Sequence, residues 1–327
     1  MSKLIVFGDD HVRFEEPYFS AKKDYFDWVA KQEWNNEENY AVHVGDFFHR
    51  RSPSPKEYQL AHRFFNSLNF KRIYVLAGNG VHEINRVKET YAVDPLEEHS
   101  NVEIVRTPQM ADIDKIKIAL LPAIPPGFYG GKSQQEYYEE WVEGHKEIEF
   151  NYIFGHFFHK EMFGDKVDID ALSGIRRMGH YHIPNLSEGY VGVNTITRSD
   201  EKGITCTLNL IDTETGEEEV QEIPKFIDFY EVDYNKATTG NVKPLDRQDC
   251  PYPIYNVYNA PDLPSIKHKY GEIYINQWFK PNEETEDKEV GVVVGEKEDL
   301  ASYLEKFFTV KKINNPTIQD KIKELIL

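Results

Sequence analysis

Short apolar runs alternate with longer amphipathic stretches over about the first 225 residues of this chain. The apolar runs have the length of strands, and the amphipathic stretches have the length of helices. Regular alternation of these two patterns is typical of an α/β domain. We therefore expect an α/β fold for residues 1–225.

The same pattern places the individual elements of this domain. Pro55 stands where the second helix is expected to begin, because the fixed φ of proline suits a first helical turn. The predicted helices are Ala21–Lys31, Pro55–Leu68, Asn85–Glu97 and Ser133–Lys146. The predicted strands are Lys3–Phe7, Tyr40–Val44, Arg72–Leu76, Val102–Val105, Lys117–Leu121, Tyr152–Phe154, Ile175–Met178, Tyr190–Val193 and Ile204–Ile211.

The segment TETGEEEVQEIPKF (213–226) predicts a hairpin with Gly216 at its turn and Pro224 at its end, so we place a domain boundary near residue 225. Residues 226–327 then form a small α+β accessory region, expected to cap the domain and to bind a partner. Its predicted strands are Phe226–Val232, Tyr255–Tyr258, Glu272–Ile275 and Glu289–Val294, and its helices lie at about 297–308 and 316–326.

Composition and charge narrow the kind of protein. The first apolar run, KLIVF, is only five residues long and is followed by charges, so neither a signal peptide nor a membrane span is expected, and we expect an intracellular, cytoplasmic protein. Cys206 and Cys250 are too few for a disulfide framework and are expected to be free thiols. The formal charge of −18 disfavours binding of nucleic acid by the bare chain. This negative charge has two interpretations. It serves solubility alone, or bound divalent cations and a basic partner offset it locally.

Five short stretches with carboxylate, amide or imidazole side chains each follow a predicted strand directly. Each begins with glycine, which permits a tight turn and a close approach of the backbone. The carboxyl ends of strands are where α/β folds collect ligands. The stretches are GDDH (8–11), GDFFHR (45–50), GNGVHE (78–83), GHFFH (155–159) and GHYH (179–182).

Together these stretches offer a mixture of oxygen and imidazole ligands that suits two divalent ions such as Mn²⁺. Asp9 and His11 share one side of an extended segment, and the same holds for His180 and His182. A carboxylate must bridge two ions that lie about 3.5–4 Å apart, and Asp46 is the candidate for it. The candidate metal ligands are Asp9, His11, Asp46, Asn79, His156, His180 and His182.

The ordered set GDxH, GDxxH, GN, GH and GHxH resembles the calcineurin-like metallophosphoesterase superfamily over about the first 210 residues. GDFFHRRSPS (45–54) and YVGVNTITRSDEKGI (190–204) are similar to the SbcD-type DNA repair and recombination nuclease subunit, especially its phage counterparts. The resemblance implies a two-sheet α/β sandwich as the metallophosphoesterase core. It also implies a cytoplasmic nuclease, which for a phage protein means the cytoplasm of the infected host.

The same resemblance implies two metal sites. Asp9, His11, Asp46 and His182 would hold one ion. The other ion would be held by Asp46, Asn79, His156 and His180. His49 matches a histidine that helps to position the scissile DNA, although a packing role is the alternative. His159 has no counterpart and could orient a ligand.

The stretch LAGNGVHE (76–83) departs from the family pattern, in which GNH is followed by an acid and the histidine acts in catalysis. Gly80 stands where that histidine is expected, and His82 follows two residues later. Either Gly80 and Val81 are an insertion that lets His82 reach the same place, or the catalytic histidine has been lost. Loss would cost about 10²–10⁴ in rate, because it removes general acid–base help.

These features lead to three functional hypotheses. The first is a DNA exonuclease or endonuclease subunit that depends on Mn²⁺ or Mg²⁺ and works with an SbcC-type coiled-coil ATPase. The resemblance also suggests a possible homodimer. Ile318, Ile322, Leu325 and Ile326 make one apolar face that would serve either that partner or the accessory region. The second is a hydrolase of small phosphodiesters or nucleotides. The third is a catalytically weakened, metal-binding scaffold subunit.

Overall fold

The computed structural model describes residues 2–80, 82–85, 90–125, 132–158, 167–234, 250–270 and 274–278. The chain divides into two compact units, Met1–Pro281 and Asn282–Leu327, and all described residues belong to the first. His159, the strand predicted at Glu289–Val294 and both predicted C-terminal helices lie outside the described residues. The apolar face at 318–326 lies outside them as well.

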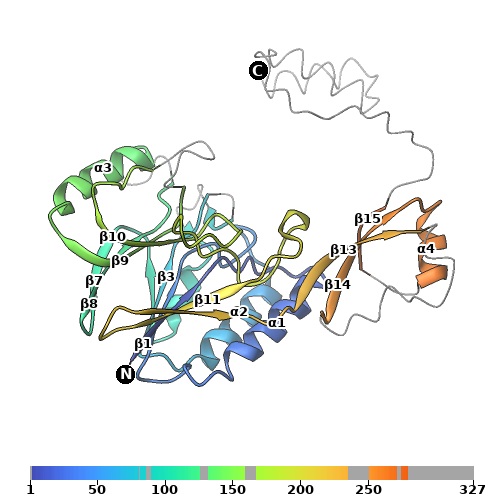
Figure 1. Cartoon of the computed structure of the whole chain (residues 1–327), viewed down its shortest axis with the longest axis horizontal. Helices are drawn as coiled ribbons and strands as arrows, with labels where there is room; N and C mark the ends of the chain where they lie inside the picture. The colour runs from blue at the N-terminus through green and yellow to red at the C-terminus, as the bar shows by residue number, and fades with distance from the viewer. Residues whose placement is uncertain are drawn as a thin grey trace, which may run out of the picture. The chain divides into compact units, whose positions relative to one another are not determined.

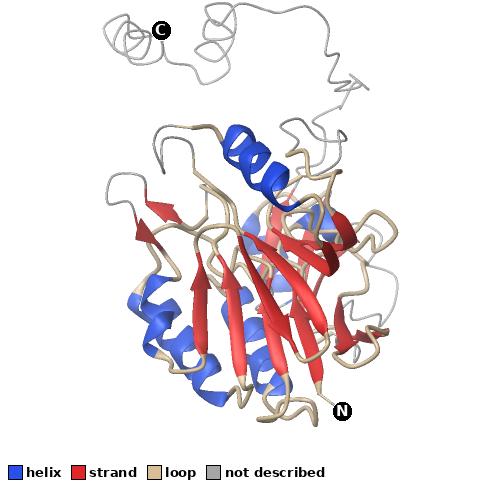
Figure 2. Cartoon of the chain, turned by 90° about the vertical axis from the view of Figure 1, so that its left-hand side faces the viewer, coloured by secondary structure: helices blue, strands red, loops and turns tan. Residues whose placement is uncertain are grey.

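A six-stranded sheet forms the first layer (Figures 1 and 2). Its central strands are parallel, and two antiparallel strands extend one side. The carboxyl ends of the parallel strands therefore meet at one edge of the sheet. In spatial order the strands are β12 (Glu218–Glu222), β11 (Thr207–Asp212), β1 (Lys3–Phe7), β2 (Tyr40–His43), β3 (Arg72–Leu76) and β6 (Val102–Val105).

A four-stranded sheet forms the second layer. Three of its strands are parallel and the fourth is antiparallel to its neighbour. The strands, in spatial order, are β10 (Ser173–Met178), β9 (Glu149–Gly155), β8 (Ile116–Leu121) and β7 (Gln109–Ile113).

The two sheets pack face to face because alternate residues of each strand point to opposite sides. Leu4 and Val6 of β1 belong to a buried cluster that also contains Ile118 of β8 and Phe154 of β9. The alternate residues Ile5 and Phe7 pack on the other side, in the cluster that also holds residues of the first two helices. This structure confirms the expected mixed α/β class and is compatible with the expected two-sheet sandwich.

Three helices cover the outer faces of the two sheets (Figure 1). Residues of α1 (Tyr18–Val29) and α2 (Pro55–Ser67) pack against the six-stranded sheet, and those of α3 (Gln134–His145) pack against the four-stranded sheet. A capping box starts α2, since the Ser54 side chain accepts a bond from the Glu57 N–H and the Glu57 side chain accepts one from the Ser54 N–H. The predicted start at Pro55 is confirmed.

A third, parallel sheet follows residue 226 and consists of β13 (Ile227–Asp233), β14 (Tyr252–Tyr258) and β15 (Tyr274–Trp278), with α4 (Leu263–Tyr270). The predicted hairpin before it is confirmed, with Gly216 at positive φ in its turn. The change of sheet thus falls near residue 225. The division into two domains at this point stays a prediction. Ile227, Phe229 and Ile254 of the third sheet belong to the same hydrophobic cluster as α1 and α2, so the core continues across residue 225.

Two sequence predictions are wrong. Instead of a helix over Asn85–Glu97, the chain forms the short pair β4 (Ile84–Asn85) and β5 (Thr90–Tyr91), and then a 3₁₀ helix at Asp94–Glu98. Pro95 lies inside the predicted helix, where its missing N–H would break the α-helical hydrogen-bond pattern, and it stands instead in the first turn of the 3₁₀ helix. The stretch predicted as the strand Tyr190–Val193 makes only isolated bridges, among them Asp9 to Val193.

Two further predictions concern cysteines and membranes. Cys206 and Cys250 are both buried and free, as expected. Among the described residues, no helix combines the length and the apolar character that a membrane crossing requires.

Candidate metal centre

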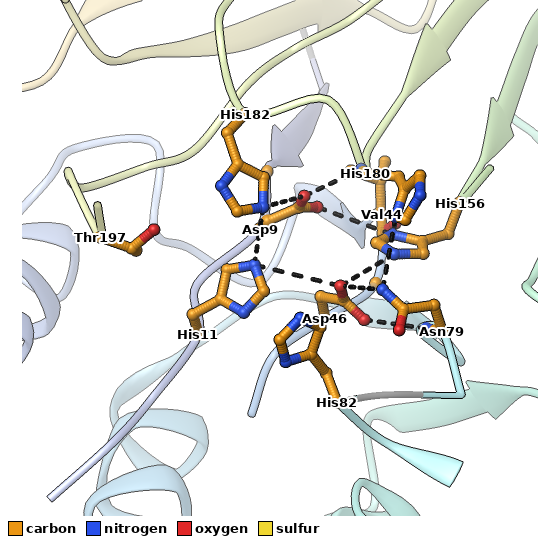
Figure 3. Close-up of polar contacts among 12 residues, drawn as sticks. Asp9, His11, Val44, Asp46, Asn79, His82, His156, His180, His182 and Thr197 are labelled. Carbon is orange, nitrogen blue, oxygen red and sulfur yellow. Dashed lines mark hydrogen bonds and ion pairs between the residues drawn. The ribbon is translucent and has the colours of Figure 1, made fainter. Parts of the chain in front are cut away.

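All seven side chains predicted as metal ligands lie in one place, at the carboxyl ends of strands from both sheets (Figure 3). Asp9 follows β1, Asp46 follows β2 and Asn79 follows β3. From the second sheet, His156 follows β9, and His180 follows β10. The face-to-face packing of the sheets is what brings these five loops together.

One group of ligands consists of Asp9, His11 and His182, whose ligand atoms all lie within 4.8 Å of one another. The Nε2 atoms of His11 and His182 are 2.9 Å apart. His182 Nε2 lies 3.7 Å from Asp9 Oδ2. Two imidazoles and a carboxylate make a ligand set for a divalent transition-metal ion.

A second group consists of Asp46, His156 and His180, with the same 4.8 Å limit between ligand atoms. Asp46 Oδ2 lies 3.1 Å from His156 Nε2. The side-chain amide of Asn79 joins this group, because its Nδ2 is 2.6 Å from Asp46 Oδ2 and 3.3 Å from His180 Nδ1.

Asp46 lies between the two groups. Its Oδ2 is 4.0 Å from His11 Nε2 in the first group and 3.1 Å from His156 Nε2 in the second. This is the position that the sequence suggested for a shared carboxylate.

Buried polar atoms in both groups lack hydrogen bonds, which fits a cation. Asp9 Oδ1 and His156 Nε2 have no hydrogen-bond partner among the described residues, although His156 Nε2 is close to Asp46. Such atoms are rare in folded proteins because burial without a partner is costly. The buried aspartates and histidines can therefore bind a metal ion.

The backbone at the site is held in an uncommon conformation. His11, Asp46 and His180 have φ values of 46°, 49° and 75°. Residues other than glycine rarely adopt a positive φ, because it strains the backbone. Such strain persists where the surrounding structure fixes the backbone, often at functional sites. Within the described ranges only two other non-glycine residues, Asp114 and Asn259, share it.

The glycines that begin the stretches leave room for the ligands. A Cβ on Gly179 would lie 2.5 Å from Asp9 Oδ1, and one on Gly78 would lie 2.2 Å from Asp46 Oδ1. Any side chain at these positions would push the carboxylates out of place.

Two of the imidazoles are oriented by hydrogen bonds from their other nitrogen. His182 Nδ1 is 2.5 Å from Oε1 of the buried Glu201, and His156 Nδ1 donates to the Val44 carbonyl oxygen over 2.7 Å. Metal-bound histidines usually have such a partner, which fixes the ring and its tautomer. Sequence reasoning missed Glu201, because a glutamate in the charged loop SDEKG carries no signal of its own.

Asp10, beside the first ligand, belongs to the support of the site and not to its ligands. Its carboxylate is fully buried and accepts a bond from Lys22 Nζ at 2.9 Å, and its Oδ2 lies 3.0 Å from His43 Nε2. Asn194 Nδ2 donates to Asp10 Oδ1 at 3.2 Å. This network ties the GDDH loop to α1 and β2.

The two proposed catalytic histidines lie beside the ligands. His49 and His82 line a cavity of about 240 Å³ together with His11, Asp46 and Asn79. His82 Nδ1 is 2.7 Å from the His49 carbonyl oxygen, and its ring centroid is 4.5 Å from that of His11. The structure thus places His82 in the cavity despite Gly80, as the insertion interpretation requires, and its role stays a prediction.

Glu83 links two of the loops that carry metal ligands. Its buried carboxyl group accepts bonds from the Gly78 N–H at 2.6 Å and from the Phe48 N–H at 3.1 Å. These bonds join the start of the GNGVHE stretch to the loop after β2. Burial, with the nearby Asp46 carboxylate, raises the pKa of Glu83 to about 8.

Burial and the charges of neighbouring groups shift the pKa values of the other site residues, some upwards and some downwards. Burial raises the pKa of Asp9 to about 7, although His156 and His182 oppose the change. Burial opposes charging of His156, but Asp46 and Asp9 outweigh it and raise the pKa of His156 to about 10. Burial lowers the pKa of His180 and that of His49 to about 4. Without a metal ion, a proton on His156 therefore supplies positive charge between the two aspartates.

Comparisons with known proteins leave the family open. No protein-family model matches this sequence, and no curated protein matches it. Among solved structures, the protein of unknown function AQ665 from Aquifex aeolicus is similar over 54% of this chain and 89% of its own, at 12% identity and a TM-score of 0.30. The hypothetical protein PH1004 from Pyrococcus horikoshii OT3 is similar over 68% of this chain and 88% of its own, at 14% identity and a TM-score of 0.33. Both TM-scores are too low to support an inference.

Proposed function

We propose that this chain is a metal-dependent phosphodiesterase that acts on DNA as a nuclease subunit. The observation that carries the proposal is the meeting of seven metal-ligand side chains from five loops, with Asp46 between two groups of ligands. Oxygen and imidazole ligands favour Mn²⁺, with Mg²⁺ as the second candidate.

The residues divide naturally between two ions. Asp9, His11 and His182 would hold one ion, and His156, His180 and Asn79 the other, with Asp46 shared. Asn79 must turn its amide by half a rotation, because its Nδ2 now faces Asp46 and only its oxygen can bind a cation. When bound, two ions would neutralise the phosphate and lower the pKa of a water molecule.

His82 is the candidate proton donor for the leaving oxygen. Its Nδ1–H donates to the His49 carbonyl oxygen, which fixes the ring and leaves Nε2 to exchange a proton with a substrate in the cavity. A positioned acid of this kind contributes about 10²–10⁴ in rate. His49 lines the same cavity and would position the scissile phosphate.

A basic or ATP-driven partner would help this chain to reach DNA. The chain carries a formal charge of −18, and like charges repel across a Debye length of about 8 Å at physiological salt. An SbcC-type ATPase, which the sequence resemblance suggests, would hold the DNA while this chain cuts it. A homodimer belongs to the same proposal.

A hydrolase of small phosphodiesters or nucleotides is the second candidate. The cavity of about 240 Å³ and the strongly negative charge both favour a small substrate over a long polyanion. This alternative predicts turnover of a small aryl phosphodiester and no cleavage of DNA, with or without an ATPase. A weakened scaffold predicts bound metal and no hydrolysis at all.

The test is digestion of linear DNA and of a small aryl phosphodiester in Mn²⁺. Wild type should cleave DNA, Asp46→Ala should abolish cleavage, and His82→Ala should lower the rate about 10²–10⁴-fold. His62→Ala is the matched control, because His62 pairs with His99 and is not among the residues that line the cavity. Full activity in Asp46→Ala would exclude the two-ion mechanism. Full activity in His82→Ala would exclude the proposed proton donor.

A further inference from the structure

Three imidazoles at the cavity form a group that the two-ion site does not use as a unit. His11, His49 and His82 come from three separate loops, and one nitrogen of each lies within 4.8 Å of the others. Their ring centroids are 4.5 Å apart for His11 and His82, 5.3 Å for His49 and His82, and 5.7 Å for His11 and His49.

Nitrogens of this group lack partners although they are buried. His11 is only 2% exposed, and its Nδ1 has no hydrogen-bond partner within the described part of the chain. The Nδ1 of His49 is also inaccessible and unpartnered there. His82 uses Nδ1 towards the His49 carbonyl oxygen, which leaves its Nε2 available. Each imidazole therefore has a nitrogen to offer to a ligand.

Three imidazoles without a carboxylate select a different class of ion from the two-ion site. Zn²⁺ is commonly held by three histidines with water in the fourth position, at Zn–N distances of about 2.0–2.1 Å. Mg²⁺ and Mn²⁺ prefer oxygen ligands, which this group does not supply. Its chemistry thus fits Zn²⁺ and similar imidazole-binding ions.

The imidazole of His11 belongs to both groups. A neutral imidazole has one nitrogen lone pair, because the other ring nitrogen carries a proton. His11 can therefore serve the group of Asp9 and His182, or the group of His49 and His82, but not both together.

We propose that His11, His49 and His82 form a Zn²⁺ site whose occupation excludes the ion held by Asp9, His11 and His182. Zinc at this site would also withdraw His49 and His82 from the substrate. Zinc binding would therefore inhibit phosphodiester cleavage, and this last step rests on the proposed function. The cavity would then respond to which cation is available.

Equilibrium dialysis of the full chain tests the site without any substrate. The protein is saturated with Mn²⁺, Zn²⁺ is added, and both bound metals are measured by elemental analysis. Each bound Zn²⁺ should release one Mn²⁺, and zinc X-ray absorption should show histidine nitrogens and no carboxylate.

Two variants separate this site from simple replacement of Mn²⁺ by Zn²⁺ in the first group. His49→Gln should weaken zinc binding at least ~10-fold, since even loss of a residue that only orients a ligand costs about 10–100-fold. Its Mn²⁺ content should be unchanged, which also shows that the variant is folded. Asp9→Asn should weaken Mn²⁺ binding and leave the zinc affinity measured without Mn²⁺ unchanged.

Equal zinc affinity in wild type and His49→Gln would overturn the proposal, because the ion would then occupy another group. If zinc binds without release of Mn²⁺, the two ions do not compete for His11, and that part of the proposal is overturned. The proposed function fails in a different experiment, namely when the Mn²⁺-loaded chain cleaves no phosphodiester. Zinc binding by the three histidines would be unaffected by that failure.

Discussion

At the scale of single residues, the absence of a side chain at Gly179 matters as much as the ligands do. Gly179 directly precedes His180, and the added Cβ would also meet the Val44 carbonyl oxygen at 2.7 Å. Backbone atoms cannot yield as a flexible side chain can, so the crowding would move Asp9 or its loop.

We expect Gly179→Ala to weaken Mn²⁺ binding about 10-fold or more, as measured by calorimetry. Gly144→Ala is the control, because a Cβ there would meet no atom of another described segment within 4 Å, and the residue lies in α3. Alanine in that helix should stabilise the fold by about 0.5–1 kcal/mol. Unchanged Mn²⁺ affinity in Gly179→Ala would show that the site tolerates displacement of Asp9.

The proton on His156 predicts how metal binding depends on pH. Its pKa of about 10 without metal means that a proton must leave when a cation binds, and Asp9, with a pKa of about 7, adds a second proton at lower pH. Affinity for Mn²⁺ should therefore rise with pH below about 10 and rise more steeply below about 7. Calorimetry in buffers of different ionisation enthalpy measures the released protons. Release of none would contradict this charge state.

At the scale of elements, the ion pair between Asp10 and Lys22 joins the first ligand loop to α1. Both side chains are buried, so removal of the lysine would leave the carboxylate with His43 and Asn194 as its partners among the described residues. The side chain of the neighbouring Lys23 is 42% exposed, and its ion pairs with Asp24 and Asp27 lie at the surface.

Lys22→Met should destabilise the protein by about 3–5 kcal/mol, because it leaves a buried charge without its partner. Lys23→Met should change stability by less than about 0.5 kcal/mol. Urea unfolding of the two variants makes the comparison. A cost below about 1 kcal/mol for Lys22→Met would mean that Asp10 is neutral or solvated in the variant.

The elements also show how far the sequence could predict this structure. Lys3–Phe7, Arg72–Leu76 and Val102–Val105 were predicted with their observed ends, because most residues of each are buried and apolar, with β-branched or aromatic side chains. The ligands were predictable for the same reason, since each follows such a strand. Strand β7 (QMADI) was not predicted, because it lacks a continuous apolar run. Glu201 and Asp10 could not be predicted either, since their importance comes from contacts that only the folded chain creates.

At the scale of the whole molecule, the site depends on two sheets at once. Asp9, His11, Asp46 and Asn79 come from loops of the six-stranded sheet, and His156, His180 and His182 come from loops of the four-stranded sheet. A cation held by both sets would link the sheets, so it should bind the folded chain much better than the unfolded one.

Removal of metal should therefore lower stability. Binding to the folded state alone contributes about 2.7 kcal/mol when the free ion stands at 100 times its dissociation constant. Calorimetric melting with Mn²⁺ and with a chelator measures the difference. His156→Gln should show a smaller difference than the wild type, because it lacks one ligand of the second ion. An equal melting temperature of the wild type with and without Mn²⁺ would contradict binding across the two sheets.

Strand β12 has a consequence for how copies of this chain can meet. It lies at one edge of the six-stranded sheet and has the sequence EEVQE, with Glu219 largely exposed. If two such edges paired in a centred antiparallel register, Glu218 of each copy would lie opposite Glu222 of the other. Like charges directly opposite each other are destabilising. At neutral pH this repulsion, which the ion pair between Arg177 and Glu218 only partly offsets, disfavours the growth of one continuous sheet through two molecules in that register.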